Sequence, residues 1–397
     1  MKENWEKIKL GDVCSKIGSG ATPKGGSGVY VEEGTSFIRS QNVYNLHFSY
    51  EGLAFINDDA AQKLKGVTVK EYDVLLNITG DSVARTCIVP KNVIPARVNQ
   101  HVAIIRVFQD RINPFFLNYY LASPFMQSYM LGLAVGKGTS RNAMTKEMIE
   151  NFTVPCPDLE VQNRIVDVLK EIDLLIENNQ KQIKLLEEAA QRLYQEWFVD
   201  LRFPGHENVK IVDGVPEGWK KERLIDIAEV QYGFAFDGSL FNNKGLGKPI
   251  VRIRNIPDSA TNDYTTEEAS EKYIVKNGDI VVGMDGEFHI NSWSGDDSYL
   301  VQRCCCFRPK NDISKGWLFL AINEPIKFYE KTVVGATVAH LSKKNIDSIV
   351  VLLPNRKYLN VFEKIYDLRL GYMNKIKRLQ EARDRLLPKL MSGEIEV

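Results

Sequence analysis

The residues best suited to chemistry in this sequence are arginines, asparagines and glutamines that occur in two matched sets. Arginine can donate two parallel hydrogen bonds to guanine, and asparagine or glutamine can pair in the same way with adenine. These side chains are therefore the ones that can read base edges in DNA. The first set is Arg39, Gln41, Asn42 and Gln100, and the second set is Arg252, Arg254, Asn255 and Gln302.

Two interpretations of the matched residues remain open. Arg39 with Arg252, and Asn42 with Asn255, could contact bases. They could equally hold the fold, because two readers of different sequences would share only structural groups. Unmatched loop residues are better candidates for sequence specificity: Thr22, Lys24, Asn77, Thr79, Arg85 and Asn99 in the first half, and Phe236, Asp285, Glu287, Arg303 and His340 in the second.

A loop rich in glycine and cations spans residues 136–142, with the sequence GKGTSRN. Glycine allows close approach to a backbone, and lysine and arginine supply the charge that phosphates attract. We expect Lys137, Thr139, Ser140 and Arg141 to contact phosphates and a DNA groove. The counterpart at residues 335–340 offers Thr337 and His340, but Val338 stands opposite Arg141.

Catalytic motifs fail on spacing. The segment from Gly132 to Thr139 resembles a phosphate-binding loop but is one residue short between its glycines. Asp285 and Glu287 are not followed by the lysine that metal nucleases need. The five histidines are scattered, and Cys304, Cys305 and Cys306 are adjacent, so neither set has metal-ligand spacing. We expect no catalytic residue, no metal and no cofactor in this chain.

Composition excludes little beyond membrane proteins. The 397 residues are 44% hydrophobic and carry 51 Lys plus Arg against 51 Asp plus Glu. The N-terminus lacks the apolar segment of a signal peptide, and no apolar stretch is long enough to span a bilayer. Six cysteines without a disulfide-like pattern fit reduced thiols, so we expect a cytoplasmic protein.

A long helix is predicted from Asp158 to Phe198, which contains no Gly and no Pro. Apolar residues recur along it at every seventh position, as in a coiled-coil seam. The row is Ile165, Ile172, Asn179, Leu186 and Leu193; Asn179 could fix the register of a helix pair or face solvent. A second helix is predicted near the C-terminus, with Ile365, Tyr372, Leu379 and Leu386 in its row and its end at Pro388.

The chain also repeats itself at long range. Asp73 recurs as Asp279 at a shift of 206, and Arg106 recurs as Arg308 at 202. The shift falls from 214 near the start to 193 in the helices, as loop deletions in the second copy would cause. Short β-like runs at 36–38, 74–78, 86–89 and 102–107, with a helical segment at 114–130, indicate a mixed domain.

We therefore predict an α+β fold with two similar, β-rich domains and two long antiparallel coiled-coil helices, related by an internal pseudo-two-fold repeat. The predicted parts are domain 1 at 1–157, a helix at 158–200, a linker at 201–218, domain 2 at 219–354 and a helix at 355–397. Residues 158–200 carry 5 basic and 10 acidic groups, and residues 355–397 carry 10 and 6, so their charges favour pairing. The alternative is that each helix packs only on its own domain.

Over its full length the sequence resembles the DNA specificity subunit of type I restriction-modification systems. The resemblance rests on the domain-helix repeat and on four segments: FPGHE at 203–207, VPEGW at 215–219, GTSR at 138–141 and LLPKLMSGEI at 386–395.

The resemblance implies a non-catalytic subunit whose two target-recognition domains each read half of a split sequence in double-stranded DNA. The helices would set the spacer and dock two methyltransferase subunits. S-adenosylmethionine, ATP and magnesium would then belong to the methyltransferase and the restriction/translocase subunits. The alternatives are a coiled-coil scaffold without sequence-specific DNA binding, and an enzyme that acts alone.

Overall fold

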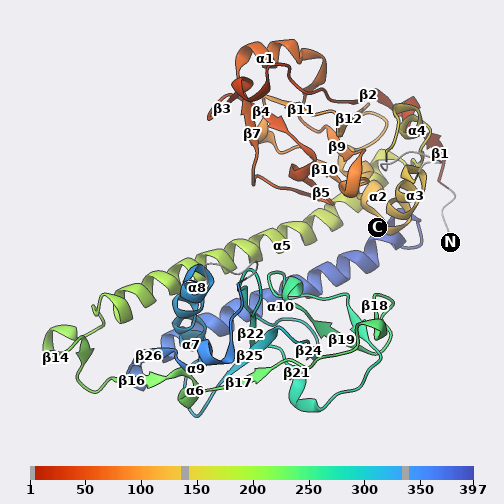
Figure 1. The fold of residues 1–397 in the computed structure, drawn as a ribbon. Coiled ribbons are helices and arrows are strands. Elements are labelled where there is room, and N and C mark those ends of the chain that lie inside the picture. Colours follow the sequence, from red (N-terminus) through yellow and green to blue (C-terminus); the bar gives the residue numbers. More distant parts are fainter. Residues whose placement is uncertain (1–4, 136–142, 333–338) are drawn as a thin grey trace. The chain divides into compact units, whose positions relative to one another are not determined.

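The computed structural model describes residues 5–135, 143–332 and 339–397 (Figure 1). The chain divides into two compact units, and the division does not follow the order of the sequence. The first unit is Met1–Leu174 with Gln380–Val397, and the second unit is Leu175–Leu379. The long helices α5 (Leu159–Tyr194) and α10 (Asn360–Met391) each contribute residues to both units.

The first unit contains two sheets and a strand pair. An antiparallel sheet has the order β10-β9-β12-β2, with bounds Thr86–Ile88, Val74–Asn77, Val102–Val107 and Cys14–Ser19. A second sheet has the order β3-β7-β4-β11-β8, with bounds Tyr30–Val31, Ala54–Ile56, Thr35–Ile38, Ala96–Val98 and Thr68–Val69. Only β4 and β11 run parallel in it. Strand β1 (Lys7–Lys9) pairs with β13 (Thr153–Pro155), and β5 (Val43–Tyr44) pairs with β6 (His47–Phe48).

The second unit repeats this topology strand for strand. Its antiparallel sheet β23-β22-β25-β17 has bounds Ile290–Ser292, Ile280–Gly283, Cys304–Pro309 and Ala228–Tyr232. Its second sheet β18-β20-β19-β24-β21 has bounds Phe241–Asn242, Tyr264–Thr265, Lys248–Val251, Ser298–Leu300 and Ile274–Val275. Here too one pair, β19 with β24, is parallel. Strand β16 (Lys220–Arg223) pairs with β26 (Val350–Leu353), as β1 does with β13. The predicted repeat and the predicted strands are confirmed.

Short helices accompany the sheets in both units. They are α1 (Asp58–Lys63), α2 (Pro114–Ala122), α3 (Pro124–Ala134) and α4 (Lys146–Glu150) in the first unit, and α6 (Leu224–Ile227), α7 (Lys315–Ala321), α8 (Asn323–Thr332) and α9 (Lys343–Asp347) in the second. The segment predicted as one helix at 114–130 is two. Ser123 is extended before Pro124, because proline disfavours helical geometry in the residue before it, and its hydroxyl caps α3 at Met126.

Strands covered on both faces consist of apolar residues without alternation. Val74, Leu75 and Leu76 in β9 are all buried, as are Ile280, Val281 and Val282 in β22. Cys304, Cys305 and Cys306 are buried in β25 with their thiols free. Burial, with the nearby Asp285 charge, raises the pKa of Cys304 to about 12. These cysteines therefore pack as small apolar residues and stay protonated at neutral pH.

The linker predicted at 201–218 is partly ordered by packing. It contains the strand pair β14 (Ile211–Val212) and β15 (Val215–Pro216). Phe203 is buried, with its ring centroid 4.6 Å from that of Trp219. The flexible composition of this segment thus hides an aromatic contact that fixes the start of the second domain.

The ends of the long helices differ from the sequence prediction in one respect. Helix α5 ends in a π-helical turn at Gln195–Val199, close to the expected Phe198. Helix α10 does not end at Pro388 but continues to Met391, and Gly393 follows it in a left-handed conformation (φ 66°). Proline removes one hydrogen bond from the last turn, which alone does not end a helix, whereas glycine adopts the left-handed geometry freely.

In the first unit the two helices share one core with the domain. Ile165 and Leu169 of α5 lie in the same buried cluster as Leu387, Leu390 and Met391. Arg383 Nη1 donates to Asp173 Oδ1 at 2.8 Å, and Tyr119 Oη donates to Asp173 Oδ2 at 2.6 Å. Asp173 therefore links α5 to both α10 and α2.

In the second unit the later part of α5 packs against the earlier part of α10. The ring centroids of Phe198 and Phe362 lie 5.2 Å apart, and Arg369 Nε donates to Glu187 Oε1 at 2.6 Å. From Asp173 to Glu187 is 14 residues forward along α5, and from Arg383 to Arg369 is 14 residues backward along α10. Both ion pairs therefore follow one antiparallel register, as the charge pattern predicted.

The seam residues are buried to different degrees. Ile165 is fully buried and Asn179 is 8% exposed, so the solvent-facing interpretation of Asn179 is wrong. The other seam residues are half-buried: Ile172, Leu186, Leu193, Ile365, Tyr372, Leu379 and Leu386. Among the described residues, no helix combines the length and the apolar content that crossing a membrane requires.

Candidate nucleic-acid interface

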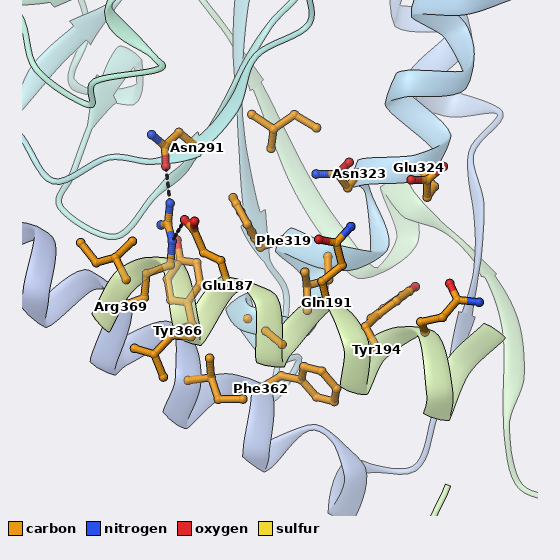
Figure 2. A pocket seen from close by; sticks show the side chains of 18 of the residues that line it. Glu187, Gln191, Tyr194, Asn291, Phe319, Asn323, Glu324, Phe362, Tyr366 and Arg369 are labelled. Carbon is orange, nitrogen blue, oxygen red and sulfur yellow. Dashed lines mark hydrogen bonds and ion pairs between the residues drawn. The ribbon is translucent and has the colours of Figure 1, made fainter. Parts of the chain in front are cut away.

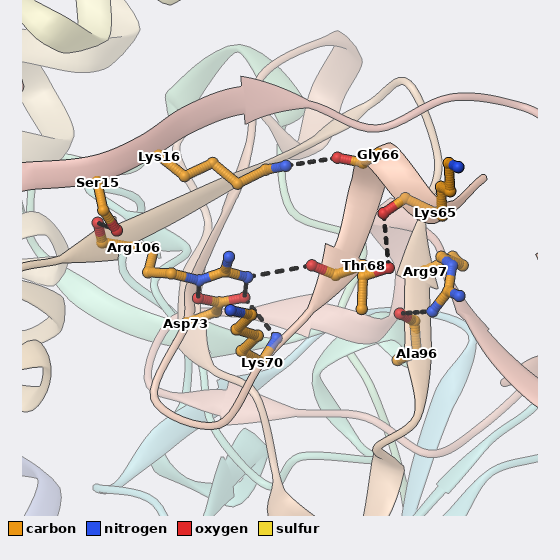
Figure 3. Close-up of polar contacts among 10 residues, drawn as sticks. All are labelled: Ser15, Lys16, Lys65, Gly66, Thr68, Lys70, Asp73, Ala96, Arg97 and Arg106. Carbon is orange, nitrogen blue, oxygen red and sulfur yellow. Dashed lines mark hydrogen bonds and ion pairs between the residues drawn. The ribbon is translucent and has the colours of Figure 1, made fainter.

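One matched ion pair lies inside each domain and supports its loops. In the first unit, Arg106 Nε and Nη2 donate to the two oxygens of Asp73, both at 2.7 Å, and Nη2 also donates to Thr68 O at 3.1 Å (Figure 3). Asp73 has no exposed surface. Arg308 binds Asp279 and Ile274 O in the same manner in the second unit, at 2.6 and 2.7 Å from Nη2.

Beside the first pair, Lys16 Nζ donates to Gly66 O, so this ammonium is also directed into the fold (Figure 3). Burial and the positive charge of Arg106 lower the pKa of Lys16. These basic groups of the first domain are engaged in holding its two sheets, so their charge is not available to DNA.

The matched asparagines have a structural role. Asn42 Oδ1 accepts from the backbone N–H of Arg39 at 3.0 Å, and its amide donates to Ser49 O and Glu51 O. Asn255 Oδ1 accepts from the backbone N–H of Arg252 at 2.9 Å. Both side chains are buried, so the structure decides against base contact and for the structural interpretation.

Two unmatched candidates are also buried. Asn77 has no exposed surface, and its amide donates to Ser40 O and Val43 O. Phe236 is buried against Tyr299, with ring centroids 5.3 Å apart. Neither can reach a base without rearrangement. The sequence displayed their chemistry but not their burial.

Three matched positions meet where strands β9 and β12, or β22 and β25, end. We call Thr79, His101 and Ala143 the first tip cluster, and Asp285, Arg303 and His340 the second tip cluster. Isolated antiparallel bridges join Thr79 to Ala143 and Asp285 to His340. The shifts of 206, 202 and 197 that relate the copies elsewhere relate these positions too.

The backbone around the two tip clusters is hydrogen-bonded in the same way. Ile78 N donates to His101 O at 2.9 Å, and Met284 N donates to Arg303 O at 2.8 Å. Met144 N donates to Ile78 O at 2.8 Å, and Leu341 N donates to Met284 O at the same distance. One backbone frame therefore presents two different sets of side chains.

The side-chain chemistry of the first tip cluster is neutral. Gln100 Nε2 lies 3.2 Å from His101 Nε2, and His101 Nδ1 lies 2.5 Å from Thr79 Oγ1. Because the Gln100 amide can only donate, His101 carries its proton on Nδ1 and donates it to Thr79. Asn99 is nearly buried and accepts from the backbone N–H of His101 at 3.1 Å. His101 is a site residue that the sequence prediction missed.

The second tip cluster is charged. His340 Nδ1 donates to Asp285 Oδ1 at 2.5 Å, and Arg303 Nε lies 3.3 Å from Asp285 Oδ2. The Arg303 side chain is 56% exposed, so its guanidinium reaches solvent. Asp285, Arg303 and His340, which were predicted separately from the sequence, are thus brought together.

Arg303 is held at a cost in backbone energy. Its φ is 72°, in the left-handed region that arginine avoids. Such a residue costs on the order of 1–3 kcal/mol, whereas an exposed ion pair contributes roughly 0–1 kcal/mol. The ion pair with Asp285 therefore does not repay the strain through stability, and strained residues of this kind concentrate at functional sites.

The remaining described candidates are spread over both units. Thr22, Lys24, Gln41, Gln100, Gln302 and Glu287 are exposed. Arg85 is half-buried over the ring of Tyr44, and Arg254 is exposed but paired with Asp263. Arg39 donates to Gly52 O at 2.7 Å, and Arg252 lies over the ring of Phe241. Exposure leaves the first six open to a ligand without further rearrangement.

The predicted phosphate-contacting residues Lys137, Thr139, Ser140, Arg141 and Thr337 lie outside the described residues. Their flanks are described. Ala143 is bridged to Thr79, and His340 is bridged to Asp285. Each of the two segments therefore returns to the chain at its own tip cluster.

A cavity of about 600 Å³ lies in the second unit beside α5, α7 and α10 (Figure 2). Phe319, Phe362 and Tyr366 contribute its apolar wall. Its buried charge, Arg369, is satisfied by Glu187, Asn291 and Ser292. The cavity therefore offers packing surface and presents no unpaired charge from Arg369.

Within the part of the chain that the structure describes, no group of three or more His, Cys, Asp or Glu residues is placed to hold a metal ion.

Comparison with known proteins places the chain among relatives of one kind. Residues 2–188 and 216–368 match the family profile described as the type I restriction modification DNA specificity domain. The MjaIX specificity subunit of Methanocaldococcus jannaschii is 23% identical over 425 residues, covering 100% of this chain and 94% of that protein. The HindI specificity subunit of Haemophilus influenzae is 22% identical over 470 residues, covering 99% and 100%.

The fold is also similar to a solved structure. The S subunit of a type I restriction-modification system from M. genitalium superimposes with a TM-score of 0.58 at 16% identity, covering 98% of this chain and 96% of that one. Its likeness supports the two-domain fold with long helices.

Proposed function

Because this chain belongs to the type I restriction modification DNA specificity family, we propose that it is the subunit that recognises the DNA target of a type I restriction-modification complex. Each domain would read one half of a bipartite sequence in double-stranded DNA. The observation that carries this proposal is the pair of tip clusters, in which one backbone frame presents Thr79 and His101 in one copy and Asp285 and Arg303 in the other.

Two readers built on one frame should keep the residues that shape the frame and differ at the residues that touch bases. The repeated ion pairs Asp73–Arg106 and Asp279–Arg308 are of the first kind, because they are buried and join loops to strands. The tip clusters are of the second kind. A single sequence that binds the same ligand twice would not need this difference.

We further propose that the helix pair sets the unread spacer between the half-sequences and docks two methyltransferase subunits. Helix α5 has 36 residues and is about 54 Å long at about 1.5 Å per residue, more than one DNA turn of about 34 Å. The shared register of the Asp173–Arg383 and Glu187–Arg369 ion pairs supports a fixed length.

We also propose that the chain itself is non-catalytic and cytoplasmic. S-adenosylmethionine, ATP and magnesium would be bound by the methyltransferase and the restriction/translocase subunits. The failure of every catalytic spacing in the sequence supports this division of labour, since recognition needs exposed hydrogen-bonding groups and no activated nucleophile.

Selection of random oligonucleotides by the complete chain with its methyltransferase partner tests the proposal. We expect enrichment of two short sequences separated by a spacer of constant length and variable composition. A coiled-coil scaffold without sequence-specific DNA binding would enrich no motif, and that result would refute the proposed function.

A further inference from the structure

We propose that Arg303 reads a guanine in the half-sequence bound by the second domain, and that Asp285 is the residue that positions it. This inference rests on the proposed function and adds to it one base, one reading residue and the domain to which that base belongs.

Asp285 divides its two oxygens between two partners. Oδ1 accepts from His340 Nδ1 at 2.5 Å, and Oδ2 lies 3.3 Å from Arg303 Nε. With Nε held by the carboxylate, the guanidinium plane is restricted and its two terminal nitrogens project beyond the pair. Among the described residues, Nη1 has only the distant His340 Nδ1 at 3.3 Å, and Nη2 has no hydrogen-bond partner.

A planar fork with two available donors matches one base edge best. Guanine presents O6 and N7 as adjacent acceptors in the major groove, and arginine can donate to both at once. Adenine and cytosine each present an amino donor there, which the guanidinium cannot accept. The ordering of the side chain by Asp285 also reduces the entropy lost on binding.

A phosphate contact is the alternative role of an exposed arginine. The Asp285 carboxylate beside Arg303 argues against it, because a second anion would be placed near an existing one. Glu287 is exposed two residues further along the same turn and adds to that repulsion. A neutral base edge does not meet this penalty.

The first domain lacks this device at the equivalent position. His101 replaces Arg303, and Thr79 replaces Asp285, so the first tip cluster offers a single ring in place of a charged fork. The two half-sequences should therefore differ at the base that faces this position.

The test is the random-oligonucleotide selection described above, repeated with Arg303→Ala, Arg303→Lys and Asp285→Asn in the full chain. Arg303→Ala should reduce discrimination at one guanine of one half-sequence by about 5- to 150-fold. All other positions, in both halves, should keep their preferences. Arg303→Lys should lose most of the same discrimination, because lysine keeps the charge but lacks the planar fork. Asp285→Asn should weaken it in part.

Arg356→Ala is the matched control, since Arg356 is also an exposed arginine paired with an aspartate, Asp312, in the second unit. It should leave the motif unchanged. Circular dichroism of each variant reports folding, and Arg303→Lys decides the question if Arg303→Ala does not fold.

Each remaining outcome separates the two levels of the proposal. If the wild-type chain gives a bipartite motif that Arg303→Lys leaves intact, the guanine assignment is overturned and the proposed function stands. If Arg303→Ala weakens all sequences equally and lowers the salt dependence by about one phosphate contact, Arg303 binds phosphate and the assignment is again overturned. If the wild-type chain enriches no motif, the proposed function fails with it.

Discussion

Asp73 shows how burial decides what a polar residue does in this protein. Its carboxylate has no exposed surface and accepts hydrogen bonds from Arg106 and from the backbone N–H of Lys70 at 2.7 Å. A charge in that position is tolerated only because it is fully paired. Its function is therefore to join the two sheets of the first domain.

Replacing Arg106 with Met should destabilise the first unit by about 3–5 kcal/mol, because the buried charge of Asp73 loses its partner. Hydrogen exchange followed by mass spectrometry should show faster exchange in β9 and β12 and no change in the second unit. Arg356→Met removes an ion pair whose side chains are 70% and 69% exposed, and should change stability by less than about 1 kcal/mol. Equal effects of the two variants would contradict the role given to Asp73.

The sequence shows which side chains can bind DNA but not which of them reach the surface. Arg303, Asp285 and His340 were predicted as single residues, and their assembly required the fold. Asn42, Asn77 and Phe236 carried suitable chemistry and are buried. His101 was missed although a signal existed, since the shift of 202 that relates Gln100 to Gln302 also places His101 opposite Arg303.

At the scale of elements, Arg369 joins three parts of the second unit. It lies on α10, donates to Glu187 on α5 at 2.6 Å, and donates to Asn291 and Ser292 of β23 at 2.8 and 2.9 Å (Figure 2). Its guanidinium also lies 5.3 Å from the ring centroid of Phe319 on α7. This single side chain therefore fixes the helix pair on the sheet that ends at the second tip cluster.

Replacing Arg369 with Met should cost about 1.5–3 kcal/mol, because hydrogen bonds from a charged group to buried acceptors are lost. The loss should appear as faster hydrogen exchange in β23 and in the earlier part of α10. Arg378→Met, an exposed position on the same helix, serves as the control and should stay within about 0.5 kcal/mol. Unchanged exchange in β23 would show that the helix and the sheet are held by apolar contacts alone.

Elements were predictable where the apolar pattern was unambiguous. The heptad rows gave both long helices, and short apolar runs gave β4, β9, β10 and β12. Two boundaries failed for opposite reasons. Ser123 and Pro124 broke a segment that was rich in helix formers, whereas Pro388 did not end a helix whose last turn is held by the buried side chains of Leu390 and Met391.

At the scale of the whole molecule, the first unit is assembled from both ends of the chain. Its core combines Leu10 and Val154 with Leu387, Leu390 and Met391. A Cβ on Gly393 would come within 3.2 Å of the Trp5 ring, so the C-terminal turn also fits closely against the first strand region. In the second unit, Phe203 contacts Trp219 at the matched position.

Replacing Leu390 with Ala should therefore destabilise the N-terminal domain, by about 2–5 kcal/mol for a buried leucine. Hydrogen exchange should accelerate in the described residues of Met1–Leu174 and remain unchanged in Leu175–Leu379. Leu368→Ala, at a position that is 55% exposed, should be close to neutral. An effect of Leu390→Ala confined to its own helix would contradict the shared core.

This assembly has a consequence for synthesis. The ribosome completes the N-terminal domain's own sequence early, but the leucines that close its core are among the last residues translated. Until then the nascent chain carries an open apolar surface that chaperones and proteases can bind. A stop codon in the final few per cent of the gene would thus disable the domain encoded at its beginning.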